Sequence, residues 1–163
     1  MTFIESKLDV DALTLTFVTE FPATVERVWQ LWADPRQLER WWGPPGYPAT
    51  FTRHDFSVPG KAVYFMEGPE GDRHYGWWSF DEISAPNALG FVDGFGDADG
   101  ENDPSMPAPG RNAVSIERVG DVTRMTIVGH SPTLESLEAG LAMGMVEGMT
   151  LGLGQIDAIL AED

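Results

Sequence analysis

Residues 131–163, SPTLESLEAGLAMGMVEGMTLGLGQIDAILAED, decide the fold because they read as one long amphipathic helix that needs a sheet to pack against. The segment starts with Ser131-Pro132 and has acidic residues in its first turns, where the helix dipole favours negative charge. Apolar side chains then recur every three or four residues, the period of one buried helical face. They are Leu134, Leu137, Leu141, Met145, Met149, Ile156 and Leu160. The pattern predicts a single continuous C-terminal helix.

Glycine occupies every fourth position along one side of this predicted helix. The row consists of Gly140, Gly144, Gly148 and Gly152, and Gly154 follows directly. At about 1 kcal/mol each relative to alanine, five glycines remove roughly 5 kcal/mol of intrinsic helix preference, so the helix must depend on tertiary packing. The row either lets strands or a second copy of the chain approach closely, or leaves room for a molecule bound between helix and sheet.

The length and composition of the chain exclude several classes of partner and of functional site. The chain of 163 residues fits one domain, which we expect to span 1–163 with its core at about 13–160. Its formal net charge of -16 disfavours nucleic acid and anionic membranes as partners. With no cysteine, the chain has no disulfide, no thiolate nucleophile and no cysteine metal site. It shows neither a signal peptide nor an apolar run long enough to span a membrane, which predicts a cytoplasmic protein.

The remaining chain reads as strands with two short helices near the start. Residues 13–21 alternate as a half-buried strand, and a helical stripe follows with Val25, Val28, Trp29 and Trp32. Asp34-Pro35 ends that helix and begins a second one carrying Leu38, Trp41 and Trp42. Six further strands are predicted, with a hairpin turn at Gly120-Asp121 between the last two. They are Thr50–Val58, Ala62–Glu67, His74–Ile83, Ala88–Gly94, Arg111–Val119 and Val122–His130.

No motif of a known catalytic machinery or metal site is present. The three histidines lie on three different predicted strands, and the sequence lacks a glycine-bracketed nucleophile and a phosphate-binding loop. His54-Asp55 and Asp81-Glu82 are typical of edge or surface residues on alternating strands, and the alternative is that they place a polar group in an apolar cavity. The acidic segment 93–109 does not fit the spacing of a calcium loop, which favours a solvated, mobile loop. We therefore expect no metal and no cofactor.

Two tryptophan pairs stand out. Adjacent helical residues point about 100° apart, so one of Trp41 and Trp42 is expected to anchor the short helices and the other to lie at a pocket mouth. Strand alternation places Trp78 with Phe80 on one sheet face, and Trp77 with Ile83 on the other. Both pairs also fit ordinary core packing.

Several motifs in one order resemble the activator-of-heat-shock-chaperone-ATPase homologue-like family of the START-like, polyketide-cyclase-like superfamily. The resemblance runs from about Leu13 to Leu160 and is carried by five motifs. These are Ala33-Asp34-Pro35, Arg40-Trp41-Trp42-Gly43-Pro44, Gly60 with Met66-x-Gly68-Pro69-Glu70-Gly71, Phe80-x-Glu82-Ile83-x-x-Pro86, and Met143-Gly144-Met145-x-Glu147-Gly148. The chain departs from many relatives at Met149 and at Ala62-Val63, where those carry bulkier or charged residues.

The resemblance implies an α+β helix-grip fold: a seven-stranded antiparallel curved sheet around a long C-terminal helix, with two short helices after the first strand. It also implies a small apolar or aromatic ligand between helix and sheet. The residues expected around this ligand are Trp32, Trp42, Phe56, Tyr64, Met66, Trp78, Phe80, Phe91, Gly144, Met145 and Met149. Alternative functions are regulation of a chaperone ATPase, with a chaperone as partner, and a polyketide-cyclase-like enzyme using a buried carboxyl such as Glu82. A homodimer is an alternative reading of the glycine row.

Overall fold

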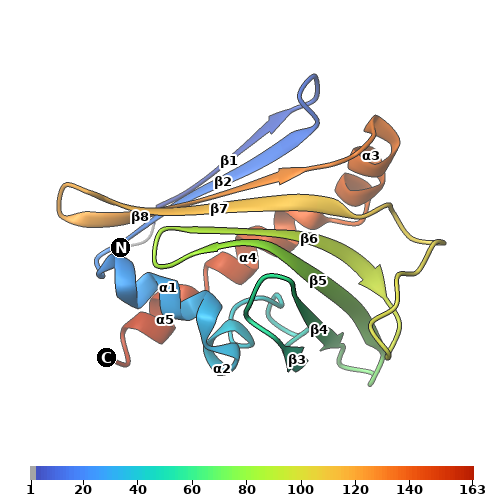
Figure 1. The fold of residues 1–163 in the computed structure, drawn as a ribbon, viewed down its shortest axis with the longest axis horizontal. Helices are drawn as coiled ribbons and strands as arrows, with labels where there is room; N and C mark the ends of the chain where they lie inside the picture. Colours follow the sequence, from blue (N-terminus) through green and yellow to red (C-terminus); the bar gives the residue numbers. More distant parts are fainter. Residues whose placement is uncertain (1–2) are drawn as a thin grey trace.

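The computed structural model describes residues 3–163, which form one antiparallel sheet with five helices. The eight strands follow the order β1-β2-β8-β7-β6-β5-β4-β3. Their bounds are β1 Phe3–Asp9, β2 Thr14–Phe21, β3 Ala49–His54, β4 Gly60–Glu67, β5 Arg73–Ser84, β6 Ala88–Gly96, β7 Gly110–Val119 and β8 Val122–His130. The helices are α1 Val25–Ala33, α2 Pro35–Leu38, α3 Leu134–Ala142, α4 Met145–Leu153 and α5 Ile156–Leu160. Figure 1 shows the sheet bending strongly along its length, with the helices gathered beside it.

The sheet has eight strands, so the expectation of seven was wrong. The additional strand is β1, which pairs with β2 from Phe3↔Glu20 to Asp9↔Thr14 at one edge of the sheet. From Glu5 to Asp9 every residue of β1 is exposed, so the strand lacks the alternation of buried and exposed positions that would reveal it. It is held by backbone hydrogen bonds to β2 and by Ile4, which packs against the core. The other seven strands lie where the sequence predicts them, although β3 ends at His54 rather than Val58.

The helices α1 and α2 form because side chains cap both starts. Thr24 accepts a hydrogen bond from the backbone N–H of Arg27 at 3.1 Å, and Asp34 accepts one from Arg36 N–H at 2.9 Å. Pro35 then occupies the first position of α2, as the sequence predicts. This second helix ends at Leu38, so Trp41 and Trp42 lie in the turns after it and not on the helix itself.

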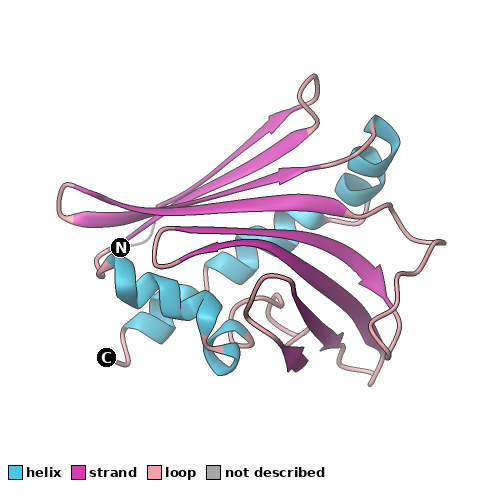
Figure 2. Ribbon diagram, in the orientation of Figure 1, coloured by secondary structure: helices cyan, strands magenta, loops and turns pink. Residues whose placement is uncertain are grey.

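The predicted continuous C-terminal helix is broken into α3, α4 and α5. Gly144, between α3 and α4, has φ of 82°, in the left-handed region that an L-residue adopts only under strain. A second interruption at Gly154-Gln155 separates α4 from α5. The low helix preference of the glycine row therefore ends the helix twice, and Figure 2 shows the three pieces following one another past the sheet.

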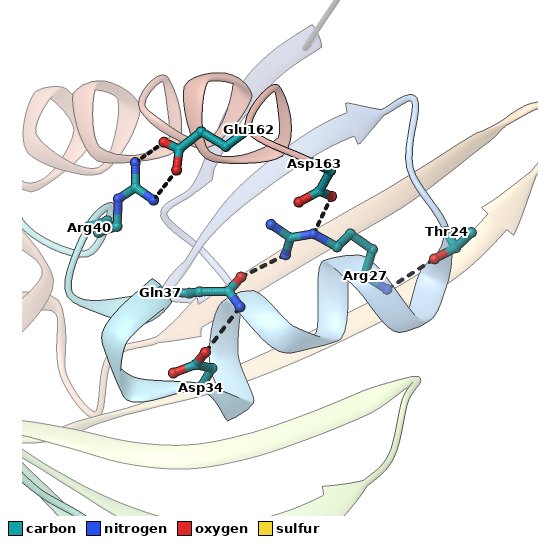
Figure 3. Close-up of polar contacts among 7 residues, drawn as sticks. All are labelled: Thr24, Arg27, Asp34, Gln37, Arg40, Glu162 and Asp163. Atoms are coloured by element: carbon teal, nitrogen blue, oxygen red, sulfur yellow. Dashed lines mark hydrogen bonds and ion pairs between the residues drawn. The ribbon is translucent and has the colours of Figure 1, made fainter.

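Polar contacts join the end of the chain to the first helices. The Arg27 Nε donates to Asp163 Oδ2 at 2.5 Å and its Nη1 donates to Gln37 Oε1 at 2.6 Å. Arg40 pairs with Glu162 through both guanidinium nitrogens. Figure 3 shows these contacts, which place α5 beside α1 even though the two helices are more than 100 residues apart in sequence.

Trp32 lies at the centre of the core. Its ring packs within 6.1 Å, centroid to centroid, of four other aromatic rings, those of Trp41, Trp42, Trp78 and Phe91. Its indole N–H donates to Met125 Sδ at 3.2 Å. The core thus ties α1 to the segment after α2 and to strands β5 and β6 through aromatic side chains, and to β8 through Met125.

Strand β5 changes its inward face part of the way along. Trp78 and Phe80 are buried as alternation predicts, but the β5–β6 register shifts between Phe80 and Glu82. Such a β-bulge moves the following residues to the opposite face. Ile83 consequently packs against the core, and the prediction that it shares the outer face with Trp77 was wrong.

Candidate functional site

A cavity of about 360 Å³ lies between the sheet and helices α3 and α4. Its floor comes from β2, β4, β6, β7 and β8, and its roof from the C-terminal helices and from Pro107 and Ala108 of the loop after β6. Apolar side chains make up most of the wall, among them Leu15, Phe17, Trp42, Met66, Phe95, Ile127, Leu137, Met143, Met145 and Met149. A volume of this size suits a small organic molecule.

Five of the residues expected around a ligand line this cavity. They are Trp42, Tyr64, Met66, Met145 and Met149. Trp42 is one member of the Trp41-Trp42 pair, while Trp41 is fully buried and donates its indole N–H to the carbonyl of Leu31 at 3.0 Å. The two neighbouring rings therefore have different positions, one in the core and one at the cavity wall.

The other six expected residues lie outside the cavity wall. Trp32, Trp78, Phe80 and Phe91 are at most 2% exposed, pack against one another in the core and do not line the cavity. Phe56 packs against Trp29 and Phe80 near α1. Gly144 sits at the break between α3 and α4, although Met143 and Met145 on either side of it do line the cavity. Two other glycines of the row, Gly140 and Gly148, also line it.

The structure adds one carboxylate to the candidate site, at a residue that belongs both to the predicted strand Ala88–Gly94 and to the acidic segment 93–109. Asp93 belongs to β6, is partly buried and lines the cavity. Asn112 on β7 donates its Nδ2 to Asp93 Oδ2 at 3.1 Å. Burial raises the pKa of Asp93 to about 6, and the hydrogen bond from Asn112 opposes this rise. Strand alternation could have found this residue, since Leu89 and Phe91 face inward and Asp93 follows at the same spacing.

Tyr64 and two tryptophans surround this polar position. Burial raises the pKa of the Tyr64 hydroxyl, the charge of Asp93 raises it further, and the indoles of Trp42 and Trp78 lower it slightly. Neither indole N–H meets the geometry of a hydrogen bond, and both are buried without a partner within residues 3–163. The protonated hydroxyl, the carboxylate and the amide of Asn112 therefore form a small polar group in an otherwise apolar wall.

The other polar candidates lie away from the cavity. Asp81 pairs with Arg111, whose Nη2 lies 2.8 Å from Asp81 Oδ1, on the exposed side of the sheet, and the Glu82 side chain is also half exposed there. His54 stacks on Phe56, and burial lowers its pKa. The proposal that Glu82 is a buried acid is therefore wrong. Within the described chain, no three His, Cys, Asp or Glu side chains are grouped so that they could hold a metal ion.

The segment 93–109 also differs from the prediction at its start. Residues up to Gly96 continue β6, and Gly96 pairs with Asn102 across the following turn. Asp97 Oδ1 accepts the backbone N–H groups of Asp99 and Glu101 at 2.9 and 3.0 Å. The loop is thus ordered by its own aspartates before it reaches the cavity at Pro107.

Comparison with known proteins identifies the family. A family model described as activator of Hsp90 ATPase homolog 1-like protein matches residues 22–161. No curated protein matches the chain. None of the helices in residues 3–163 is long and apolar enough to cross a membrane.

Solved structures agree with this match. A solution NMR structure of an Arthrobacter aurescens protein is 46% identical, with a TM-score of 0.92, 98% of this chain covered and 92% of that one. A crystal structure of a Mycobacterium smegmatis protein is 41% identical, with a TM-score of 0.88 and 96% of each chain covered. The AHSA1 protein from Silicibacter pomeroyi shares the fold at 24% identity, with a TM-score of 0.72, 91% of this chain covered and 97% of that one. The chain therefore belongs to the activator of Hsp90 ATPase homolog 1-like family.

Proposed function

We propose that the protein binds a small apolar or aromatic molecule in the cavity between the sheet and helices α3 and α4. The observation that carries this proposal is the cavity itself, about 360 Å³ with a mainly apolar wall and a few polar groups at one place. Ligand sites in proteins have this construction, because the apolar wall provides affinity and the few polar groups orient the ligand.

Methionine gives the cavity an adaptable entrance. Met143 and Met145, on either side of the helix break, are 52% and 42% exposed and also line the cavity. Their flexible, polarisable side chains can repack around ligands of different shape. Burying such exposed apolar surface against a ligand is favourable by about 25 cal/mol per Å². The exposed methionines therefore support a binding role at this face.

Titration with N-phenyl-1-naphthylamine tests the proposal, because this neutral probe fluoresces when it leaves water. Gly148 lines the cavity, and a Cβ added there would meet no atom within 4 Å. Gly148→Leu should fill part of the cavity and weaken probe binding at least tenfold. The control is Ala142→Leu, at an exposed residue of α3 outside the cavity wall, which should bind as the wild type does. A wild-type protein that leaves the probe fluorescence unchanged would contradict the proposal.

A second candidate is a cyclase-like enzyme that moves a proton on a bound carbonyl compound. Asp93 favours it, because a carboxyl with a pKa of about 6 in an apolar cavity can act as a base near neutral pH. Hydrogen–deuterium exchange at the central carbon of benzoylacetone, followed by NMR, measures such a step. Asp93→Asn should abolish acceleration by the protein, whereas Glu82→Gln, at an exposed carboxyl, should retain it. Equal rates with and without protein would remove this candidate.

Regulation of a chaperone ATPase stays an alternative, and the family description is what supports it. Co-purification with an Hsp90-type chaperone and stimulation of its ATPase rate are the decisive measurements. If the protein neither co-purifies with the chaperone nor stimulates its ATPase, this alternative is excluded.

The homodimer is a further alternative, suggested by the glycine row. Analytical ultracentrifugation tests it, and a monomer at high protein concentration would refute it.

A further inference from the structure

The inward row of β6 is apolar except at one position. Leu89 and Phe91 are at most 1% exposed, and Phe95 lines the cavity two residues beyond Asp93. Asp93 lies opposite Trp78 of β5 and Gly110 of β7 in the sheet. A carboxyl at this point stands in a wall where its neighbours would favour an apolar side chain. Such a placement makes the carboxyl a candidate binding group of the cavity.

The hydrogen-bonding capacity of Asp93 is only partly used. A carboxylate can accept about four hydrogen bonds, and within residues 3–163 Asp93 accepts one, from Asn112 Nδ2 to Oδ2. No donor of the described chain reaches Oδ1, and no Arg, Lys or His side chain pairs with Asp93. The nearby Arg111 instead donates to Asp81 on the exposed side of the sheet. The cavity therefore presents an acceptor oxygen without a donor.

Asn112 fixes the direction of this acceptor. It lies opposite Gly129 on β8, and a Cβ at that glycine would be 3.2 Å from Asn112 Oδ1. The amide thus fits over a position without a side chain, while its nitrogen holds Asp93 Oδ2. Tyr64, on the neighbouring wall, keeps its proton because burial raises its pKa, so it adds no charge beside the carboxylate.

We infer that the ligand of this cavity has an apolar or aromatic body and carries one hydrogen-bond donor, an O–H or N–H group, which it presents to Oδ1 of Asp93. The inference rests on the proposed ligand-binding function and specifies its ligand class. Molecules that offer only acceptors leave the carboxylate oxygen without a donor even where they meet the buried indole N–H groups of Trp42 and Trp78, and ionised acids place a second negative charge beside it. Fatty acids and aromatic carboxylates are therefore poor ligands, whereas phenols and amines of the right size are good ones.

Three naphthalene probes test the inference at about pH 7.5 by isothermal titration calorimetry: 2-naphthol, a donor; 2-methoxynaphthalene, an acceptor only; and 2-naphthoate, an anion. The wild type should bind 2-naphthol about tenfold more tightly than 2-methoxynaphthalene, which corresponds to about 1.4 kcal/mol, and should bind 2-naphthoate weakest. Asp93→Leu should remove the preference for the donor while binding 2-methoxynaphthalene at least as well. Asp99→Leu, which removes an exposed carboxylate outside the cavity wall, should leave the preference intact.

Asp93→Asn serves if the leucine variant does not fold, and it should reduce the preference several-fold because a neutral amide oxygen is a weaker acceptor. If the wild type binds 2-naphthol and 2-methoxynaphthalene equally, or if the preference persists in Asp93→Leu, the inference is overturned while ligand binding stands. If no probe binds the wild type, the proposed function fails, and the inference fails with it.

Discussion

Gly152 of α4 packs directly against the backbone of Trp41: a Cβ on this glycine would lie 2.7 Å from the Trp41 carbonyl oxygen and 3.6 Å from that of Trp42. A backbone carbonyl inside a packed core cannot easily move. The close approach therefore holds α4 against the segment that carries both tryptophans. It also means that one glycine of the row serves packing, whereas Gly148, one turn earlier, faces space.

This difference gives the first prediction. Gly152→Ala should lower the free energy of unfolding by roughly 1–3 kcal/mol, because the added methyl group overpacks the site. Gly148→Ala should raise it by up to about 1 kcal/mol through its better helix propensity. Urea unfolding followed by tryptophan fluorescence measures both. A Gly152→Ala variant as stable as Gly148→Ala would show that the contact between Gly152 and Trp41 is not rigid.

The break at Gly144 gives the second prediction. With φ at 82°, any L-side chain is strained there, so Gly144→Ala should destabilise the protein by about 1 kcal/mol. Gly144→Asn should cost less, since asparagine tolerates the left-handed region. Thermal unfolding compares the two variants. A stabilised Gly144→Ala would mean that α3 and α4 join into one helix in solution, as the sequence pattern suggests.

The third prediction concerns pH. Asp93 has a pKa of about 6 in the folded protein and about 3.9 in an unfolded chain, so its ionisation opposes folding. The loss of folding stability caused by this ionisation is absent below about pH 4, grows as pH rises from about 4 to about 6, and is complete above about 6. Asp93→Asn should therefore stabilise the protein by roughly 1–2 kcal/mol at pH 8, a range reduced because Asp93 is partly exposed, and by much less at pH 4.

The other groups around Asp93 do not reverse the direction of this pH dependence. Tyr64 from β4 stays protonated across the window, and Asn112 from β7 is neutral at every pH. Arg111, His130 and Ser131 also line the cavity, but none of them contributes to the raised pKa of Asp93, which comes from burial. A stability difference that does not change between pH 4 and pH 8 would show that Asp93 is solvated in the folded protein.

The fourth prediction concerns the contacts in Figure 3. Arg40 and Glu162 are both exposed, and water and salt screen such pairs strongly. Glu162→Gln should therefore lower the melting temperature only slightly, and the difference should disappear in about 1 M salt. Asp163→Asn, which removes the partner of the more buried Arg27, should have the larger effect. A larger loss in Glu162→Gln would mean that the Arg40 pair is the one that holds α5 in place.

The sequence predicted the candidate site only at residues whose suitable side chain also lies next to the cavity. Trp42 and Met149 were recognisable from the aromatic motif and from the helical stripe, and both line the cavity. Trp78 and Phe91 have equally suitable side chains, yet their rings stack on each other at 4.2 Å in the core. Sequence patterns show that such residues face inward, but not whether a neighbouring ring or an empty volume meets them. Asp93 was overlooked because it was grouped with the acidic residues that follow it, although the predicted strand Ala88–Gly94 includes it.

The sequence by itself determined the order of most elements and the faces that they bury. Alternation of apolar residues predicted β2, β7 and β8, and turn-forming residues predicted the hairpin at Gly120-Asp121 and the end of α1 at Asp34-Pro35. These follow from local preferences and from the period of burial, which neighbouring residues encode. Only the tertiary structure decided the edge strand β1, the two breaks in the C-terminal helix and the cavity around Asp93. Each depends on contacts between distant segments, because an edge strand needs a partner, a glycine-rich helix needs a surface, and a cavity is the volume that distant side chains leave unfilled.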